Sequence, residues 1–548
     1  MSHQELEPKN LHIEKRPLSP LPQVEILGIT TVPNAQEELS AIATAPTIFA
    51  GESARTCYSN QGIYRPSDYL NPNHKRITDE VIQSTRAAGH LTTRQHFAIT
   101  FGIANISRQL IWSFLHNHPF YNSEQVSQRY VAVKENNFFI PPLENKALEI
   151  YTQNAQEQIK AYHQLKELLS PDVSREYLRI FPSRKGKKET KGAVEKKAQE
   201  IARYVLGVDT FAYLYHTINP LTLLRYFRAC SFSDVPLETK TLIYEMVNQT
   251  TKFDPRFLDE IDKEPFPKNQ TPEWQILNSK RTIIDFGQAK SFKDEFDQKL
   301  GDYTSKLTDW SVNGPQSLAT AIRTVLGITT SQLSDREATE LVLNPAKNKT
   351  LNDILNLTTL NKISQALHNV SYTFSKKLSH TADSQDQRHR MIPGARPLIA
   401  THYSGEPDYI TPLLIQKNPK ALSLYQNIME KTFTTINQLL KMGIPEEYAL
   451  YRLPNAFPIR FTETGSLLNL HHKYRMRLCY NAQREIWQAS KEEVEQISQI
   501  HPQIGRWLLA PCGLRRLASI SPFCPEGNHY CGQQIWEKPL EKYPLRII

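Results

Sequence analysis

One pattern of residues occurs twice in this chain of 548 residues, and the repeat restricts the fold more than any other feature of the sequence. The run 369–374 is similar to the run 96–101, at an offset of 273 residues. Further along, Ser466 is equivalent to Asn219 at an offset of 247 residues. Repetition on this scale predicts duplication and fusion of one domain, and not a solenoid of short repeats.

Each copy is predicted to be α+β, because short alternating segments typical of strands lie among long amphipathic segments typical of helices. Pro419 at the start and Gly443 just past the end delimit one of these helices. The predicted elements are strands at 24–29 and 96–103, and helices at 148–169, 375–387 and 419–442.

Breaks in composition divide the chain into five predicted parts. The first 22 residues are polar and contain proline, without the apolar stretch of a secretory signal. Four prolines between residues 255 and 272 interrupt regular structure between the copies. The predicted parts are a disordered leader at 1–22, a first copy at 23–255, a linker at 256–275, a second and degenerate copy at 276–500, and a cysteine-containing tail at 501–548.

The composition is that of a globular protein large enough for two or more cores. Hydrophobic residues make up 39% and charged residues 22% of the chain, and no run of 18 apolar residues predicts a membrane span. Six cysteines in so long a chain do not predict a disulfide scaffold, which favours a reducing cytoplasm.

The net charge of +9 is compatible with anionic partners of several classes, namely nucleic acid, anionic lipid and phosphorylated small molecules. The densest basic stretch, at 184–197, is interpreted as a solvated loop and helix face. No nucleic-acid motif or aromatic stacking platform accompanies it. Phosphate-bearing ligands therefore explain the charge without nucleic acid.

Short motifs occur in a fixed order along the first copy. They are 53–58 (SARTCY), 89–96 (GHLTTRQH), 101–108 (FGIANISR), 127–130 (SQRY), 139–142 (FIPP) and 202–206 (ARYVL). This order resembles the flavin-dependent thymidylate synthases, whose pattern reads GHxSxxEH, an aromatic strand and SR helix, an Arg-His-Arg triplet, SxRY and ARxVLP. The resemblance implies the family's fold, a central antiparallel sheet flanked by helices, in each copy. Arg94-Gln95 departs from the acidic residue that the family has there.

The two copies have lost different parts of this pattern. The first keeps SxRY, but its run 116–119 contains no arginine in either of two registers. The second keeps the triplet as 388–390 and has no SxRY after it. At the C-terminal motif the first copy keeps Asn219, whereas the second keeps the terminal arginine as Arg477. Each copy therefore retains the half that the other lacks.

In the family the active sites lie between subunits, so the resemblance implies that copy one faces copy two. One complete site would then form from the retained halves, and the facing site, built from the lost halves, would be inactive. Arg477 is predicted to be catalytic, because a guanidinium at the pyrimidine edge favours the N3-deprotonated ring. The residues predicted for dUMP are Ser127, Arg129, Arg203, Gln385, Arg388 and Arg477. Those predicted for FAD are His90, Thr92, Asn219, Arg225, Arg388, His389 and Arg390. Taken singly, each has a plainer interpretation as a solvated cation, a structural histidine or a salt-bridge residue.

The function implied by the resemblance is FAD-dependent methylation of dUMP to dTMP. Methylenetetrahydrofolate would supply the carbon and NADPH the electrons, and a homodimer would form a pseudo-tetramer. The alternative is a catalytically inactive duplicate that binds nucleotide or flavin in a regulatory or scaffold role. A nucleic-acid scaffold is a third hypothesis, and the net positive charge is its sole support.

The tail carries three cysteines and a histidine within 22 residues, which lie outside the family resemblance. Three thiols and an imidazole suit a tetrahedral structural zinc site. The spacing lacks CxxC hairpins, so small buried hydrophobes beside a surface histidine remain the alternative. The candidate ligands are Cys512, Cys524, His529 and Cys531.

Overall fold

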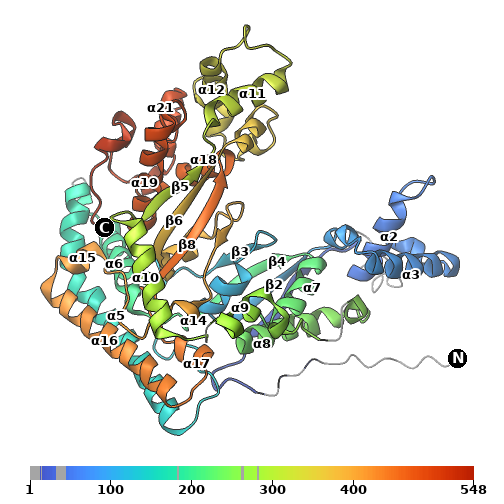
Figure 1. The fold of residues 1–548 in the computed structure, drawn as a ribbon, viewed down its shortest axis with the longest axis horizontal. Helices are drawn as coiled ribbons and strands as arrows, with labels where there is room; N and C mark the ends of the chain where they lie inside the picture. The colour runs from blue at the N-terminus through green and yellow to red at the C-terminus, as the bar shows by residue number, and fades with distance from the viewer. Residues whose placement is uncertain are drawn as a thin grey trace.

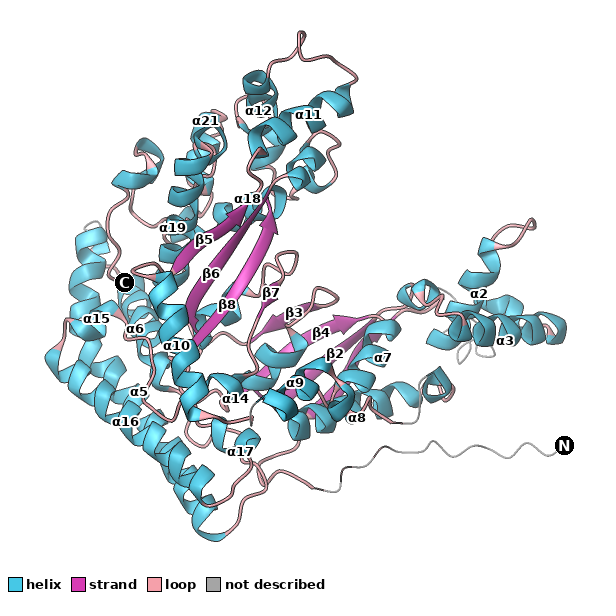
Figure 2. Ribbon diagram, viewed as in Figure 1, coloured by secondary structure: helices cyan, strands magenta, loops and turns pink. Residues whose placement is uncertain are grey.

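The computed structural model describes residues 11, 13, 15–32, 45–181, 184–260, 264–280 and 283–548. Most of the predicted leader, at residues 1–10, 12 and 14, lies outside these ranges. Figures 1 and 2 show two sheets of strands, each with helices against it and long helices joining the two halves. Among the described residues, no helix is long and apolar enough to cross a membrane.

The two sheets have the same topology. The first has four antiparallel strands in the order β1 (Gln23–Ile29), β2 (Ile99–Ser107), β4 (Phe211–Ile218) and β3 (Asn122–Gln125). The second has the order β5 (Ser305–Trp310), β6 (Ser371–Ser379), β8 (Pro458–Ser466) and β7 (Gly394–Ala395), again antiparallel. The predicted α+β class with two antiparallel sheets is confirmed.

The strand register reproduces both offsets between the copies. Phe101 lies opposite His216 in the first sheet, and Phe374 lies opposite Glu463 in the second, so equivalent partners differ by 273 and 247 residues. A β-bulge in β2, where Asn105 has a φ of +57°, adds one residue and reduces the first offset to 272 at the end of the strand. Apart from this bulge, β2 pairs with β4 in the same register as β6 with β8.

The long helices agree with prediction, and one shorter helix does not. The segment 148–169 lies within α5 (Asn145–Ile180), and α16 (Pro419–Lys441) ends just before Gly443, whose φ is +78°. The helix predicted at 375–387 is wrong over its first five residues. β6 continues to pair with β8 as far as Ser379, and only α13 (His380–Asp386) is helical.

Helices cover both sheets and connect the halves. α5 packs along α16 (Figure 1). Buried side chains of both copies belong to one apolar core. A second core lies between copy two and the tail. The remaining α-helices of the described residues are α2 (Pro46–Cys57), α3 (Pro72–Ala87), α4 (Arg108–Leu110), α6 (Lys188–Ala202), α7 (Pro220–Ala229), α8 (Pro236–Thr251), α9 (Pro272–Lys280), α10 (Phe286–Leu300), α11 (Gly314–Leu326), α12 (Asp335–Leu343), α14 (Ile399–His402), α15 (Leu413–Gln416), α17 (Glu446–Leu450), α18 (Leu467–Arg477), α19 (Arg484–Ile500), α20 (Pro502–Gly505) and α21 (Pro511–Leu517).

The linker predicted at 256–275 contains two short 3-10 turns, Phe257–Glu260 and Lys268–Gln270, and the start of α9. Residues 261–263 lie outside the described ranges. The five domain boundaries therefore stay a prediction.

The copies face each other about an approximate two-fold axis. Gly207 forms an antiparallel bridge with Pro454, its equivalent at an offset of 247. On either side, Val208 N donates to Leu453 O at 2.9 Å and Asn455 N donates to Leu206 O at 2.7 Å. Exchange of the copies converts one hydrogen bond into the other. This is the isologous pairing expected between two like subunits.

Two buried clusters of a serine, a glutamate and a tyrosine repeat the same symmetry. Glu238 accepts hydrogen bonds from Ser107 and from Tyr451 Oη of the other copy, the latter at 2.6 Å. The second cluster has the equivalent residues Ser379, Glu485 and Tyr204, with the same bonds. Each tyrosine crosses between the copies, so these clusters help to hold them together.

Glu238 gives a testable dependence of stability on pH. Burial raises its pKa from the usual 4.5 to about 7, so the folded protein binds more protons than the unfolded chain between these values. The stability contributed by Glu238 is therefore full below pH 4.5 and is lost as the pH rises to 7. We expect the free energy of unfolding of the wild type, relative to Glu238→Gln, to fall by about 3 kcal/mol across this window. Urea titrations of both proteins at several pH values measure this difference in the free energy of unfolding. The same pH dependence in the wild type and in Glu238→Gln would contradict a raised pKa of Glu238.

Candidate active site between the copies

Two arginines of copy one reach across to the loop between α18 and α19. Arg129, which follows β3, pairs with the buried Glu200 and donates from Nη2 to Asn481 O at 2.8 Å. Arg203, at the end of α6, donates from Nη2 to Gln483 Oε1 at 2.7 Å. Ser127 Oγ accepts from Arg129 N at 3.2 Å and closes the turn that presents this arginine.

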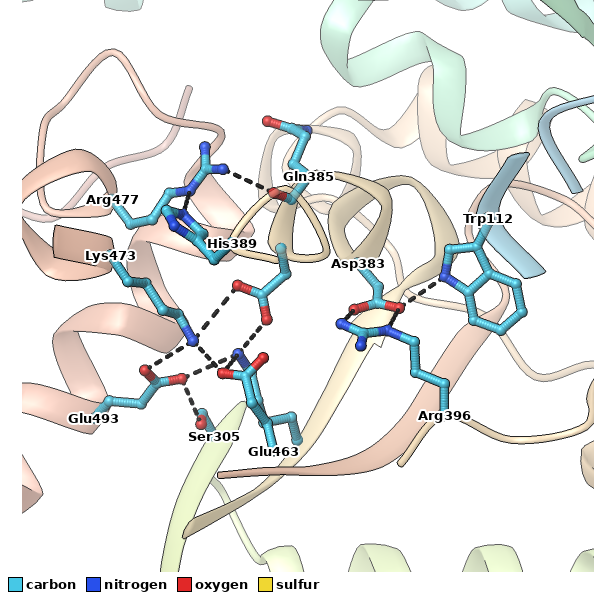
Figure 3. A network of polar contacts seen from close by, with 12 residues as sticks. Trp112, Ser305, Asp383, Gln385, His389, Arg396, Glu463, Lys473, Arg477 and Glu493 are labelled. Atoms are coloured by element: carbon cyan, nitrogen blue, oxygen red, sulfur yellow. Dashed lines mark hydrogen bonds and ion pairs between the residues drawn. The ribbon is translucent and has the colours of Figure 1, made fainter. Parts of the chain in front are cut away.

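The copy-two residues continue the same chain of hydrogen bonds. Gln385 Nε2 donates to Gln483 Oε1, and Arg477 Nη2 donates to Gln385 O at 2.7 Å. Arg477 Nε donates to His389 Nε2 at 2.8 Å, which requires a neutral imidazole with its proton on Nδ1 (Figure 3). An unbroken path thus joins Arg203 of copy one to His389 of copy two.

Positive charge accumulates along this path, with the carboxylates of Glu200 beside Arg129 and of Asp386 near Arg477. Burial, together with the nearby Arg129 and Arg388, lowers the pKa of Arg477 to about 10 even though Asp386 opposes this. Burial, with Arg203 beside it, lowers the pKa of Arg108 to about 9. Within the described residues, Nε of Arg108 and Nε of Arg203 are buried without a hydrogen-bond partner. Converging guanidinium groups with unused donors are suited to an anionic ligand.

A groove of about 270 Å³ lies beside this path and is lined by both copies. Arg388 donates from Nη2 to Ser123 O at 3.1 Å, and its guanidinium also meets the exposed carboxylate of Glu124. Arg390 lies 5.2 Å above the ring of Tyr121. Ser123 Oγ and Tyr121 Oη are buried and have no partner among the described residues. The groove therefore combines cations from copy two with aromatic and polar groups from copy one.

Comparison with known proteins shows the family of the chain. A family model described as thymidylate synthase complementing protein matches residues 39–256 and 306–503, which together are more than half of the chain. The chain belongs to this family. The first matched segment contains β2, β3 and β4 but not β1. The second contains β6, β7 and β8 and all of β5 except Ser305.

Curated relatives of the chain are flavin-dependent thymidylate synthases. The protein of Clostridium tetani is 26% identical over 213 residues, which are 38% of this chain and 80% of the relative. That of Sulfurisphaera tokodaii is 33% identical over 149 residues, so that 26% of this chain spans 55% of that relative. That of Pyrococcus abyssi is 27% identical over 190 residues, with 32% of this chain and 76% of the relative aligned.

The other residues predicted for the cofactor lie together in the first family segment. Asn219 caps α7 by accepting from Thr222 N at 2.8 Å, and Arg225 on the same helix lies 4.9 Å above the ring of Phe120. The turn Thr92–Gln95 contacts α7, and His90 and Thr92 are exposed at its start. No hydrogen bond between described side chains links His90 or Thr92 to copy two. Arg390, which donates to Pro119 O at 3.5 Å, approaches this group most directly.

The copy-one counterpart of the triplet contains neutral groups, and its His118 ring lies 5.4 Å from that of Tyr121 in the groove. Tyr226 Oη bonds to Nε2 of His118 at 2.8 Å and of His216 at 3.0 Å. Burial lowers the pKa of His118 to about 4 and that of His216 to about 3, so both are uncharged at pH 7. Cys230 occupies the position equivalent to Arg477. The triplet's counterpart therefore offers no cation to an anionic ligand.

Copy two has no arginine at the position of Arg129, where the strand register places Ala400, and its nearby Arg396 is held in another contact. Arg396 forms a two-bond ion pair with the buried Asp383, with Nε and Nη2 at 2.7 and 2.8 Å from its oxygens. Asp383 also accepts from Trp112 Nε1 of copy one at 2.7 Å (Figure 3). Arg396 is fixed by this ion pair within copy two, whereas Arg129 reaches Asn481 O of the other copy.

The zinc set predicted in the tail is not assembled. Among the residues that the structure describes, no three His, Cys, Asp or Glu side chains are grouped so that they could hold a metal ion. Cys512, Cys524 and Cys531 line a small cavity with Cys479, and His529 is not among the described residues around it. Burial raises the pKa of Cys512 to about 12 and raises those of the other three thiols. Protonated thiols pack there as small hydrophobes, which was the alternative.

Sequence reasoning missed the residues that join the two sides. Asn481 contributes a backbone oxygen, which leaves no trace in side-chain identity. Gln483 belongs to the motif 482–486 (AQREI), so the family pattern was a signal that could have indicated it. Arg94, next to the Gln95 that replaces the family's acidic residue, is buried and paired with Glu260 at 2.6 Å. This ion pair joins the loop to the turn Phe257–Glu260 of the linker. The basic stretch at 184–197 is mostly exposed as predicted, except that Lys197 turns to Glu200 at 3.6 Å.

Proposed function

We propose that this protein is an FAD-dependent thymidylate synthase that methylates dUMP to dTMP at one site shared between its two copies. The observation that carries the proposal is the path of hydrogen bonds from Arg203 through Gln483 and Gln385 to Arg477. The path brings the halves retained by each copy into contact. The relatives' names, flavin-dependent thymidylate synthase, support the reaction class, and methylenetetrahydrofolate as carbon donor is part of the proposal.

The arginines would contact different parts of the nucleotide. Arg129, Arg203 and Arg388 would bind the phosphate, for which planar guanidinium groups are the preferred partners. Arg477 is held by His389 and Gln385 through Nε and Nη2, and its Nη1 makes no hydrogen bond with described residues. Nη1 would stabilise negative charge on the pyrimidine as N3 loses its proton, which makes C5 nucleophilic. No side chain needs to attack the ring.

The groove residues fit FAD. Arg388 and Arg390 offer charge for a pyrophosphate, Tyr121 and Tyr215 offer aromatic surface, and buried Ser123 Oγ offers a free polar group. His389, the middle residue of the triplet, contacts Arg477 and so links cofactor and substrate sides. Reduced FAD, when bound, supplies the hydride and one-carbon transfer chemistry.

The deciding experiment is formation of dTMP by the purified protein. It is supplied with FAD, dUMP, methylenetetrahydrofolate and NADPH under low oxygen, and replacement of NADPH by NADH is the matched control for the nicotinamide. Catalytic turnover supports the proposal. Bound flavin without dTMP would overturn it in favour of an inactive duplicate that binds flavin or nucleotide.

A second prediction concerns the cofactor alone. Arg390→Ala removes the cation above Tyr121 and is expected to weaken FAD binding about tenfold, because the cation–aromatic contact that shapes the groove and a charge-assisted bond to the cofactor are lost together. Flavin fluorescence titration of the apoprotein measures the affinity. Arg516→Ala, whose guanidinium binds Trp536 O in the tail, is the control and should leave FAD binding unchanged. Equal affinity in wild type and Arg390→Ala would place FAD elsewhere.

Three finer statements belong to the same proposal. NADPH serves as reductant, two chains pair into a pseudo-tetramer, and the protein acts in the cytoplasm. Mass measurement of the native protein in solution tests the second, and a monomer at working concentration would overturn it.

A further inference from the structure

Five charged side chains are buried together in the core of copy two. Lys376 Nζ lies 2.5 Å from Asp386, 3.3 Å from Glu463 and 3.2 Å from Glu493. Lys473 contacts the same three carboxylates, at 3.5 Å for Asp386 and 3.3 Å for Glu493 (Figure 3). All five side chains are at most 2% exposed. Burial of so many charges is costly and is tolerated only when each charge is paired.

The equivalent positions in copy one carry no such network. The offsets of 273 and 247 residues place Ile103, His216, Tyr226 and Met246 where copy two has Lys376, Glu463, Lys473 and Glu493. Either register of the triplet's counterpart places Phe114 or Leu115 at the position of Asp386. The two copies have the same fold, so the fold does not require these charges. They occur only in the copy that keeps the Arg-His-Arg triplet and Arg477.

One member of the network faces the site. Asp386 lies one turn before His389, whose backbone N donates to Asp386 O at 3.0 Å. Lys473 lies one turn before Arg477 on α18. Each residue of the Arg477–His389 pair therefore lies one turn after a member of the network. The charge of Asp386 acts on both Arg477 and His389, whereas Glu493 is directed to Ser305 Oγ at 2.9 Å, on β5.

We propose that Asp386 is a positioning residue, kept ionised in the core by Lys376 and Lys473 so that it serves as the buried counter-charge of the Arg477–His389 pair. It fixes the guanidinium in the orientation that acts on the pyrimidine, without touching substrate itself. This inference rests on the proposed function. Phosphate binding by Arg129 and Arg203 does not depend on it, so its loss affects turnover more than substrate affinity.

The chain offers a matched pair of variants. Asp386→Asn and Glu493→Gln each remove one negative charge from the same two lysines with almost no change in shape, but only Asp386 faces the site. Asp386→Asn leaves two lysines with two glutamates, so the remaining network is balanced. We expect it to lower kcat for dTMP formation at least about tenfold while KM for dUMP changes less than about threefold. Glu493→Gln should keep kcat within about threefold of the wild type.

Steady-state kinetics on the FAD-loaded proteins, well below each melting temperature, decide the matter. A wild-type kcat in Asp386→Asn would overturn the inference and leave the proposed function intact. Equal losses in both variants would also overturn it, because they would show a network that serves stability alone. A wild type that makes no dTMP would overturn the proposed function and this inference together.

Discussion

Arg477→Ala is expected to lower kcat for dTMP formation by about 10²- to 10³-fold, the usual cost of removing one donor aimed at developing negative charge. The guanidinium is fixed by His389 and by Gln385 O, so the alanine variant loses an oriented charge that water cannot replace. Arg477→Lys keeps the charge without the planar fork and should recover only part of the rate. Single-turnover measurements with saturating dUMP separate the chemical step from binding.

Two controls make this prediction specific. Arg475, two residues earlier on α18, binds Leu351 O at 2.9 Å, so Arg475→Ala tests loss of a neighbouring guanidinium outside the site. We expect a change in kcat of less than about threefold. His118→Ala alters the copy-one counterpart of the triplet, whose uncharged His118 bonds to Tyr226 Oη, and should cost far less than Arg477→Ala. A comparable loss from His118→Ala would contradict one complete site per chain.

Arg452→Met is expected to lower the free energy of unfolding by about 3–5 kcal/mol, the cost of leaving a buried ion-pair partner alone. Arg452 is 1% exposed and lies where copy two meets copy one. Its guanidinium bonds to Asp209, Gln158 and, at 3.2 Å, to Asn154 Oδ1, all from copy one. Urea denaturation followed by circular dichroism measures the loss.

The double variant Arg452→Met/Asp209→Asn is the matched control for this prediction. It removes the uncompensated carboxylate and should regain a substantial part of the stability, because a neutral amide is cheaper to bury than a carboxylate. Unchanged stability in the single variant would show that the copies are held together chiefly by the apolar core that they share. Activity of the folded single variant should remain, because Arg452 contacts no residue of the hydrogen-bond path.

Much of the fold was predictable because it has a local or periodic basis. Strand alternation, a proline at the start of α16 and a glycine after it have direct effects on neighbouring backbone. The boundary of α13 was not predictable in this way, since Ser371–Ser379 becomes a strand through pairing with β8, some 87 residues further on. The zinc prediction failed for another reason. The three cysteines line one cavity with Cys479, but His529 is not part of its lining, and no three His, Cys, Asp or Glu side chains of the described residues are grouped so that they could hold a metal ion.

The sequence by itself determined which copy retains which residues, since motif order and the absence of arginine at 116–119 are properties of the chain alone. It also determined the family. Only the tertiary structure decided that the retained halves meet. Arg203 and Gln483 are 280 residues apart, and their contact depends on how α5 and α16 bring the copies together about the axis at Gly207 and Pro454. Likewise, only packing placed Asp386 beside two lysines from different elements, because electrostatic contacts between distant segments have no periodicity in sequence.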